Sequence, residues 1–191
     1  MHNSNTLLIK VTVLGDLGSW ENIVKSLGHI LSIRSNVNYL DTIGFSYMEI
    51  SIDGSILGLN VSEIILCTYL LSNDKEKRSI WSSHFKESPV TIIIMSSKDL
   101  SERFASDTMR RTGESSISNL ISTMLSPSEK SVSPCIVFKS LSPNNYDHFL
   151  LVLRYLLINV LEKSRSKCVG IIAIEKLKER RKIKKGVAIE C

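Results

Sequence analysis

The sequence predicts an α/β fold, in which a mostly parallel sheet carries helices on both faces. Runs rich in Ile and Val alternate with segments of helical periodicity along the 191 residues. The first run, residues 7–14, is followed by a turn with two glycines and then a helical pattern, which is typical of a strand-loop-helix unit. A later Asp-Gly pair, residues 53–54, separates two apolar runs and predicts a tight antiparallel hairpin.

Six strands are expected from these runs. The second and third flank the Asp-Gly pair and should be antiparallel neighbours, whereas the others alternate with helices and should pair in parallel through crossover connections. The expected strands cover residues 7–14, 45–52, 56–61, 90–96, 135–138 and 168–174.

Helices are expected at residues 21–33, 75–86 and 146–164. Residues 100–125 are expected to form two helices or one broken helix, and the basic segment after residue 174 is expected to form the last helix. The first helix places Ile23, Leu27 and Ile30 on one face, which predicts an amphipathic helix. The helix at residues 146–164 is apolar nearly all round, which favours burial against the sheet and against a second surface.

The composition is that of one globular domain. Hydrophobic residues make up 43% of the chain and charged residues 23%. The four cysteines are scattered and form no Cys-x-x-Cys pair, so we expect neither a zinc site nor a disulfide framework, and we expect a cytoplasmic protein. The predicted division is a domain at residues 1–175 and a basic segment at residues 176–191.

The positive charge is concentrated near the end of the sequence. Residues 175–185 hold seven basic and two acidic residues, a net +5 that equals the charge of the whole chain. Such a segment favours contact with an anionic membrane surface, which would make the protein peripheral; nucleic acid is the weaker alternative, because the rest of the chain is balanced. A third alternative is a solvated helix whose long side chains cover the core. The basic residues are Lys176, Lys178, Arg180, Arg181, Lys182, Lys184 and Lys185.

The turn after the first strand has the frame of a phosphate-binding loop without its functional residues. A P-loop reads G-x-x-x-x-G-K-[ST], and Gly15 fits the first position. Trp20, Glu21 and Asn22 stand where the second Gly, the Lys and the Ser or Thr belong. A carboxylate repels a triphosphate, and an indole fills space that the backbone needs for close approach.

The same turn leaves two interpretations open. Gly15, Asp16 and Gly18 are the candidate remnants of a phosphate site at a helix N-terminus, and the alternative is a tight turn with no ligand. Trp20 either fills the vacated pocket or is an exposed aromatic for a partner.

Two segments resemble Ras-like small GTPases of the Rab type. Residues 39–54, YLDTIGFSYMEISIDG, are similar to the first switch region and second strand of that family. Residues 78–104 are similar to its second switch helix, fourth strand and the start of its third helix. The resemblance covers residues 7–104 and implies a six-stranded Ras-like fold. It also implies that Thr42 is a vestigial Mg²⁺-binding and γ-phosphate-sensing residue, with a bare loop hydroxyl as the alternative.

The nucleotide motifs of that family are altered throughout. Glu63 and Leu66 take the places of the D-x-x-G motif, residues 140–143 read Ser-Leu-Ser-Pro in place of N-K-x-D, and residues 175–177 replace the S-A-K loop. The resemblance therefore implies a pseudo-GTPase that binds proteins without hydrolysing GTP and needs no cofactor. The alternative is an atypical GTPase that binds GTP or GDP with Mg²⁺ as a switch.

The resemblance also points to a partner surface. In the family the second switch helix and the first switch region contact effectors, which implies Phe45, Tyr47, Trp81 and Phe85 as partner-binding residues here. Packing of this helix on the sheet is the alternative. No Ser-His-Asp or Cys-His arrangement is recognisable, so no catalytic residue is expected.

Overall fold

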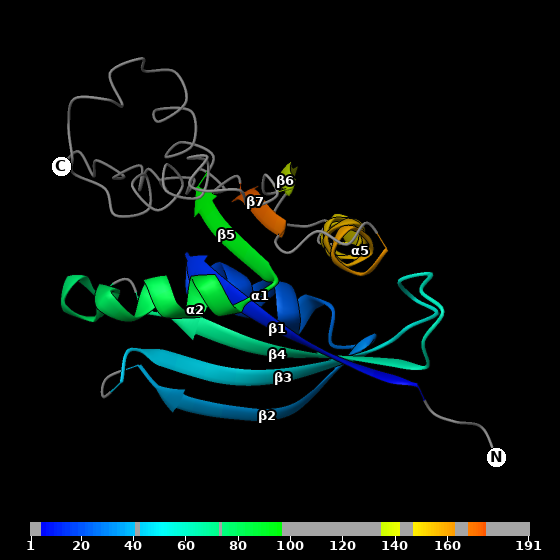
Figure 1. Cartoon of the computed structure of the whole chain (residues 1–191), viewed down its shortest axis with the longest axis horizontal. Helices are drawn as coiled ribbons and strands as arrows, with labels where there is room; N and C mark the ends of the chain where they lie inside the picture. The colour runs from blue at the N-terminus through cyan, green and yellow to red at the C-terminus, as the bar shows by residue number, and fades with distance from the viewer. Residues whose placement is uncertain are drawn as a thin grey trace, which may run out of the picture.

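The computed structural model describes residues 5–40, 43–72, 74–96, 135–141, 147–162 and 168–174 (Figure 1). Within these ranges the chain forms seven strands, three α-helices and one 3-10 helix. The strands are β1 (Thr6–Gly15), β2 (Leu31–Tyr39), β3 (Phe45–Asp53), β4 (Glu63–Leu71), β5 (Val90–Ser96), β6 (Cys135–Leu141) and β7 (Cys168–Ile174). The helices are α1 (Leu17–Ser26), η1 (Lys75–Ile80), α2 (Trp81–Glu87) and α5 (Asp147–Leu161).

All seven strands belong to one sheet, in the order β2-β3-β4-β1-β5-β7-β6. β3 is antiparallel to both of its neighbours, and the remaining pairs are parallel. The α/β class with one antiparallel strand, which the sequence predicts, is therefore confirmed. The sheet has one strand more than expected, because β2 and β4 were not predicted and the strand predicted at residues 56–61 does not form.

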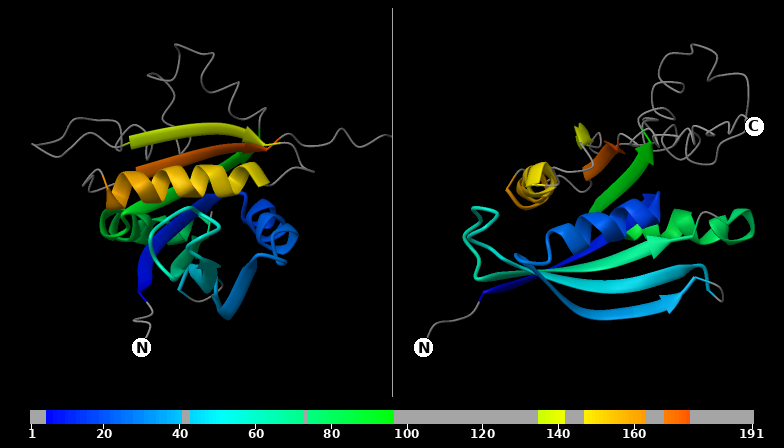
Figure 2. Two further views of the ribbon diagram at one scale, coloured as in Figure 1. Left: turned by 90° about the vertical axis from the view of Figure 1, so that its right-hand side faces the viewer. Right: turned by 180° about the vertical axis from the view of Figure 1, so that it is seen from behind.

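The helices divide between the two faces of the sheet. α1 and α5 cover one face, whose buried side chains form a large aliphatic core that includes Val11 and Val13 of β1. α2 covers part of the other face, where Trp81 packs with Leu14 and Ile93. Figure 1 shows α2 in front of β1 and β4, and the view from behind in Figure 2 brings α1 to the front.

The first helix is shorter than predicted, and β2 follows it. α1 ends at Ser26, and the amide of Gly28 donates to the carbonyl oxygen of Lys25 in the turn that follows. The prediction of a helix to residue 33 was wrong because Leu31 falls on a helical face and equally on a strand that is buried on one side. In the structure Leu31 pairs with Ile52 of β3.

The predicted strand at residues 56–61 is also wrong. The chain turns after Asp53 as the Asp-Gly pair suggests, but its partner strand begins only at Glu63, which pairs with Asp53. The intervening turn is held inward by Leu57, which is 1% exposed in the core under α5. The apolar residues in this segment therefore anchor a loop to the core and do not form a strand.

Glu63 and Leu66 consequently lie inside β4 and not in a loop after the third strand. The loop that follows this strand starts at Ser72, so the D-x-x-G comparison was placed on the wrong residues.

The other predicted strands and the helices at residues 75–86 and 146–164 are confirmed within a few residues. The expected helix at residues 100–125, Thr42, and the basic segment at residues 176–191 lie outside the described residues. In the part of the chain that the structure describes, no helix has the length and apolar character needed to cross a membrane.

Candidate functional site

The candidate site lies where the parallel strands β1, β4 and β5 end. In open α/β sheets, ligands bind at this carboxyl edge, near the point where neighbouring strands connect in opposite directions. β1 occupies that point here, because it pairs with β4 on one side and β5 on the other. The residues around the end of β1 therefore test the phosphate-loop interpretation.

The turn between β1 and α1 is too short to form a phosphate cradle. β1 ends at Gly15 and α1 begins at Leu17, so Asp16 is the one residue between them. Trp20, which stands at the second Gly of the motif, already lies inside α1. A P-loop needs several extended residues whose amides surround the phosphates, and here those positions form the first helical turn.

Gly15 is required by packing against β5. Its φ is +100°, and a Cβ built on it would lie 2.0 Å from the carbonyl oxygen of Ile94. The next amide, that of Asp16, donates to the same oxygen at 3.0 Å. A glycine at this position therefore has a structural cause that involves no ligand.

The side chain of Asp16 occupies the N-terminus of α1. Its Oδ1 accepts from the amide of Ser19 at 3.2 Å, and its Oδ2 accepts from the Ser19 hydroxyl at 2.9 Å. This is an N-cap, which satisfies a helix amide that an anion would otherwise use. Gly18, the third candidate, is exposed on this first turn.

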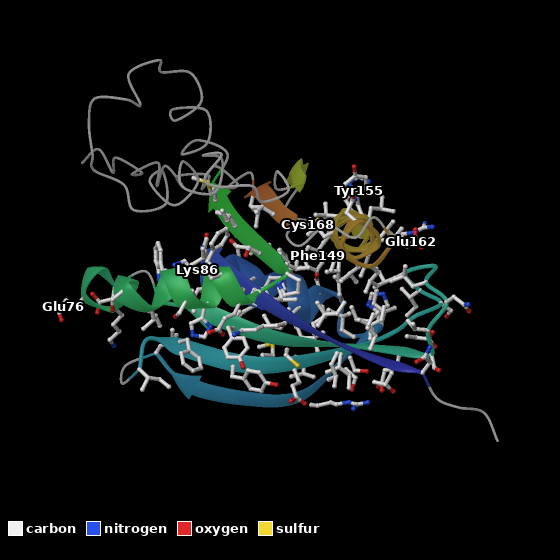
Figure 3. All side chains as sticks on the ribbon, viewed as in Figure 1. Glu76, Lys86, Phe149, Tyr155, Glu162 and Cys168 are labelled. Atoms are coloured by element: carbon white, nitrogen blue, oxygen red, sulfur yellow. The ribbon has the colours of Figure 1, made fainter. Side chains whose placement is uncertain are left out.

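Trp20 is fully buried under α5. It is 0% exposed, and its ring meets the ring of Phe149 edge-on at 5.5 Å between centroids. Figure 3 shows Phe149 on the side of α5 that faces the sheet. The interpretation of Trp20 as an exposed partner contact is therefore wrong, and the indole is part of the core.

The residues of this turn lack the phosphate-binding groups of the P-loop motif. The helix N-terminus already carries the carboxylate of Asp16. Glu21, at the position of the phosphate-binding Lys, is exposed, and its Oε2 lies 3.6 Å from the Nζ of Lys25. Within the described residues, no group of three or more His, Cys, Asp or Glu side chains could hold a metal ion.

The loop before β3 is fastened to the segment after β4. The amide of Ser72 donates to the carbonyl oxygen of Gly44 at 2.8 Å, and the ammonium of Lys77 donates to the carbonyl oxygen of Leu40 at 2.6 Å. The indole N–H of Trp81 donates to the Ser72 carbonyl oxygen at 3.0 Å. The two segments that resemble the switch regions are thus joined by direct contacts.

Beside this junction, aromatic rings gather on the sheet face that carries α2. The ring centroids of Phe45 and Tyr47 lie 5.5 and 5.2 Å from that of Tyr69, and the imidazole of His84 lies 4.9 Å from Tyr69. The Lys10 ammonium sits 4.8 Å from the centre of the Tyr69 ring, a cation–π contact. We call these five residues the aromatic cluster.

Charges and burial tune the groups of the cluster. Burial, aided by the nearby Lys10 charge, lowers the pKa of His84, whose Nδ1 is buried without a partner in the described structure. The hydrogen bond from Lys10 holds the pKa of Glu87 below its usual value. Burial raises the pKa of Tyr47, and its hydrogen bond to Glu49 acts in the same direction.

The four predicted partner residues are not equally accessible. Phe45, Tyr47 and Phe85 are half-buried, whereas Trp81 is 3% exposed and belongs to the core. Trp81 therefore supports the junction from beneath and cannot offer its ring to a partner. Sequence reasoning missed Tyr69, His84 and Lys10; the alternation of β4 would have placed Tyr69 on this face had its start been set at Glu63.

A hollow lies at the opposite end of the strands. It encloses about 360 Å³, and its polar wall includes Asp53 and Glu63. Both carboxylates are already engaged: Asp53 accepts from the amide and hydroxyl of Ser55, and Glu63 accepts from Ser51 and Arg34. These hydrogen bonds lower the pKa of each group, with Ser51 as the main cause at Glu63.

The chain matches no protein-family model, and the search of curated proteins found no match. Among solved structures, the Arl6 (BBS3) small GTPase from Trypanosoma brucei with a bound nucleotide analogue, GppNp, aligns over 88% of this chain and 87% of that chain. The two share 10% sequence identity at a TM-score of 0.33. At that score the alignment does not define a shared fold, so the description of the sheet rests on its own topology.

Proposed function

We propose that this protein is a pseudo-GTPase: a small-GTPase-like α/β domain that binds another protein and neither binds nor hydrolyses GTP. The observation that carries the proposal is the turn between β1 and α1. Asp16 is its single residue and caps α1 with its carboxylate, so the place of a phosphate cradle holds a negative charge.

The partner would bind beside the aromatic cluster. Ile43 is 48% exposed immediately before β3, and half-buried rings of Phe45, Tyr47 and Phe85 follow on the same side of the sheet. Aromatic side chains dominate the binding energy of protein interfaces, and the charges of Lys10 and Glu87 at the margin of the surface suit a polar rim.

Thermal unfolding with and without nucleotide tests the first half of the proposal. A ligand at 100 times its Kd stabilises a protein by about 2.7 kcal/mol, which moves Tm by several degrees. We expect GTP and GDP with Mg²⁺ to leave Tm unchanged, and guanine nucleotide to be absent from the natively purified and then denatured protein. A Mg²⁺-dependent rise in Tm with GTP would instead support the atypical-GTPase alternative.

Partner capture from a native extract tests the second half. Ile43→Glu places a charge at an exposed residue just before β3, and we expect it to lose partners that the unaltered chain retains. Leu151→Glu is the matched control, because Leu151 is 58% exposed on α5, which covers the opposite face of the sheet. Equal capture by both variants would place the partner surface elsewhere.

The basic residues from Lys176 to Lys185 add a proposed contact with anionic membranes. Each basic residue near such a surface contributes about 1 kcal/mol, and the attraction weakens with salt because the screening length is about 8 Å at physiological ionic strength. Deleting residues 175–191 should abolish binding to vesicles that contain anionic lipid. Absence of vesicle binding by the full chain at low salt would exclude the membrane contact, and salt-sensitive binding to RNA or DNA would favour nucleic acid.

A further inference from the structure

Glu49 is a half-buried carboxylate on the sheet face that carries α2. Its Oε1 accepts from the hydroxyl of Tyr47 at 2.6 Å, and within the part of the chain that the structure describes it forms no salt bridge. The glutamates nearby on β4 and α2, Glu63 and Glu87, each have a cation as partner. Burying part of a charge costs free energy unless an opposite charge compensates it, so Glu49 is the group that a cationic ligand would neutralise.

Two tyrosine rings and a thiol surround this carboxylate. Tyr47 precedes Glu49 by two residues on β3 and so shares its face, and the centroid of the Tyr47 ring lies 5.2 Å from that of Tyr69 on β4. Cys67 pairs with Glu49 in the register of β3 and β4 and is half-buried. We call Tyr47, Glu49, Cys67 and Tyr69 the tyrosine–carboxylate site.

A neighbouring pair of groups already holds a cation. The ammonium of Lys10 lies 4.8 Å from the centre of the Tyr69 ring and forms a salt bridge with Glu87. An aromatic ring and a carboxylate thus bind one ammonium, which the chain itself supplies. Tyr47 and Glu49 present the same two groups on the next strand, with no cation beside them among the described residues.

The face around the site is open and locally acidic. Leu8, two residues before Lys10 on β1 and therefore on the same face, is 66% exposed. The described strands carry three carboxylates against two cations on this face, although the whole chain has a net charge of +5. The carboxylates belong to Glu49, Asp53 and Glu63, and the cations to Lys10 and Arg34. A positively charged group is therefore the complementary occupant.

From this arrangement we infer that the tyrosine–carboxylate site binds an arginine or lysine side chain from a basic segment of the protein partner. The cationic group stacks on the Tyr47 ring and donates to Glu49, as Lys10 does at Tyr69 and Glu87. The phosphates of a membrane or a nucleic acid carry the same sign as Glu49 and are repelled. That the cation belongs to a protein partner rests on the proposed function, whereas the cation site itself stands on the contacts.

Titration of the full chain with a basic peptide, followed at single amides by NMR, tests the site. The probe is the capped peptide Gly-Arg-Gly-Arg-Gly, and the same peptide with glutamine in place of both arginines is its control. We expect the arginine peptide to shift the amide signals of Tyr47 and Glu49, with an affinity that falls as salt is added, because salt screens exposed charges. The glutamine peptide should leave both signals in place.

Three variants assign the binding to the site. Glu49→Gln removes the charge and keeps an acceptor for the Tyr47 hydroxyl, and it should weaken peptide binding about five-fold, as loss of a partly solvated ion pair does. Tyr47→Leu removes the ring and leaves the carboxylate, with a loss of about the same size. Glu162→Gln is the matched control at an exposed glutamate just after α5, labelled in Figure 3, and should bind as the unaltered chain does.

Either half of the peptide result can overturn the site. Absence of an arginine-dependent shift at low salt overturns it, and so does equal binding by the unaltered chain and the variants Glu49→Gln and Tyr47→Leu. If one of these two variants fails to fold, the other decides. Weaker binding by the folded variants, with full binding by Glu162→Gln, supports the site.

Partner capture separates the site from the proposed function. Capture that Glu49→Gln loses, and that the arginine peptide but not the glutamine peptide competes away, supports a basic partner segment. Capture that Ile43→Glu loses and Glu49→Gln retains overturns the basic segment while the proposed partner surface stands. An unaltered chain that captures no partner overturns the proposed function, and the peptide titration then still decides whether the cation site exists.

Discussion

The two faces of the sheet use the same strands and opposite chemistry. Val11 and Val13 of β1 point into the aliphatic core under α1 and α5, whereas Lys10 and Thr12, at the alternate positions, face α2. β3 is divided in the same way: Met48 lies in the aliphatic core, and the residues directly before and after it lie on the other face of the sheet. One face therefore carries the larger part of the buried core, and the other combines a smaller buried cluster with groups that a partner can meet.

The largest expected effect is on the aliphatic face. Trp20→Ala should lower the free energy of unfolding by about 3–5 kcal/mol, because it removes a fully buried ring and leaves a cavity. Phe85→Ala, on the other face, should cost at most about half of that, because the ring is only partly buried. Urea denaturation of both variants measures the difference, and equal losses would show that both faces support the fold alike.

A smaller loss of stability is expected from a change in the turn between β1 and α1. Asp16→Ala removes the N-cap of α1 and should cost about 0.5–2 kcal/mol. Asp16→Asn keeps an acceptor for the Ser19 amide and serves as the control, with a cost near zero. If both variants unfold at the same urea concentration as the unaltered chain, the carboxylate does not stabilise the helix and its role as a cap is wrong.

The central parallel strands were easier to predict from sequence than the hairpin region. The runs at residues 7–14 and 90–96 are apolar on nearly every residue, as strands buried on both faces are, and both were placed within two residues. The failures lie in the hairpin region. Leu57 anchors a turn and Leu31 opens a strand, and an apolar residue in a short run carries no sign of which element it belongs to.

The sequence shows which phosphate-binding residues are replaced, but it does not show the contacts that the remaining residues of the turn make. The loss of the phosphate-binding Lys at Glu21 can be read directly from the motif. The role of Gly15 could not, because it depends on the carbonyl oxygen of Ile94, a residue 79 positions away that only the paired sheet brings near. The hydrogen bond between Lys77 and the carbonyl oxygen of Leu40 likewise has no local signature in the sequence.

The smallest expected effect concerns His84, a titratable residue on the face of the sheet that carries α2. Its pKa is lowered in the folded chain by burial, then by Lys10 of β1, while Glu87 on its own helix acts in the opposite direction. The unfolded chain therefore takes up the proton first, near pH 6.5, and the folded state loses stability as the pH falls through that value. The stabilising contribution is present above it.

The window between pH 7 and pH 5 isolates this histidine from the carboxylates whose pKa values are lowered, because Asp53, Glu63 and Glu87 have ordinary values of 3.8, 4.5 and 4.5 and titrate at lower pH. We expect the free energy of unfolding to decline across the window, and His84→Phe to flatten that decline while its ring keeps the contacts with Phe45 and Tyr69. Urea titrations at several pH values measure both slopes. If the free energy of unfolding falls with pH equally in the two chains, the imidazole is as easily protonated in the folded cluster as in water. The aromatic cluster would then tolerate a positive charge that its packing is expected to resist.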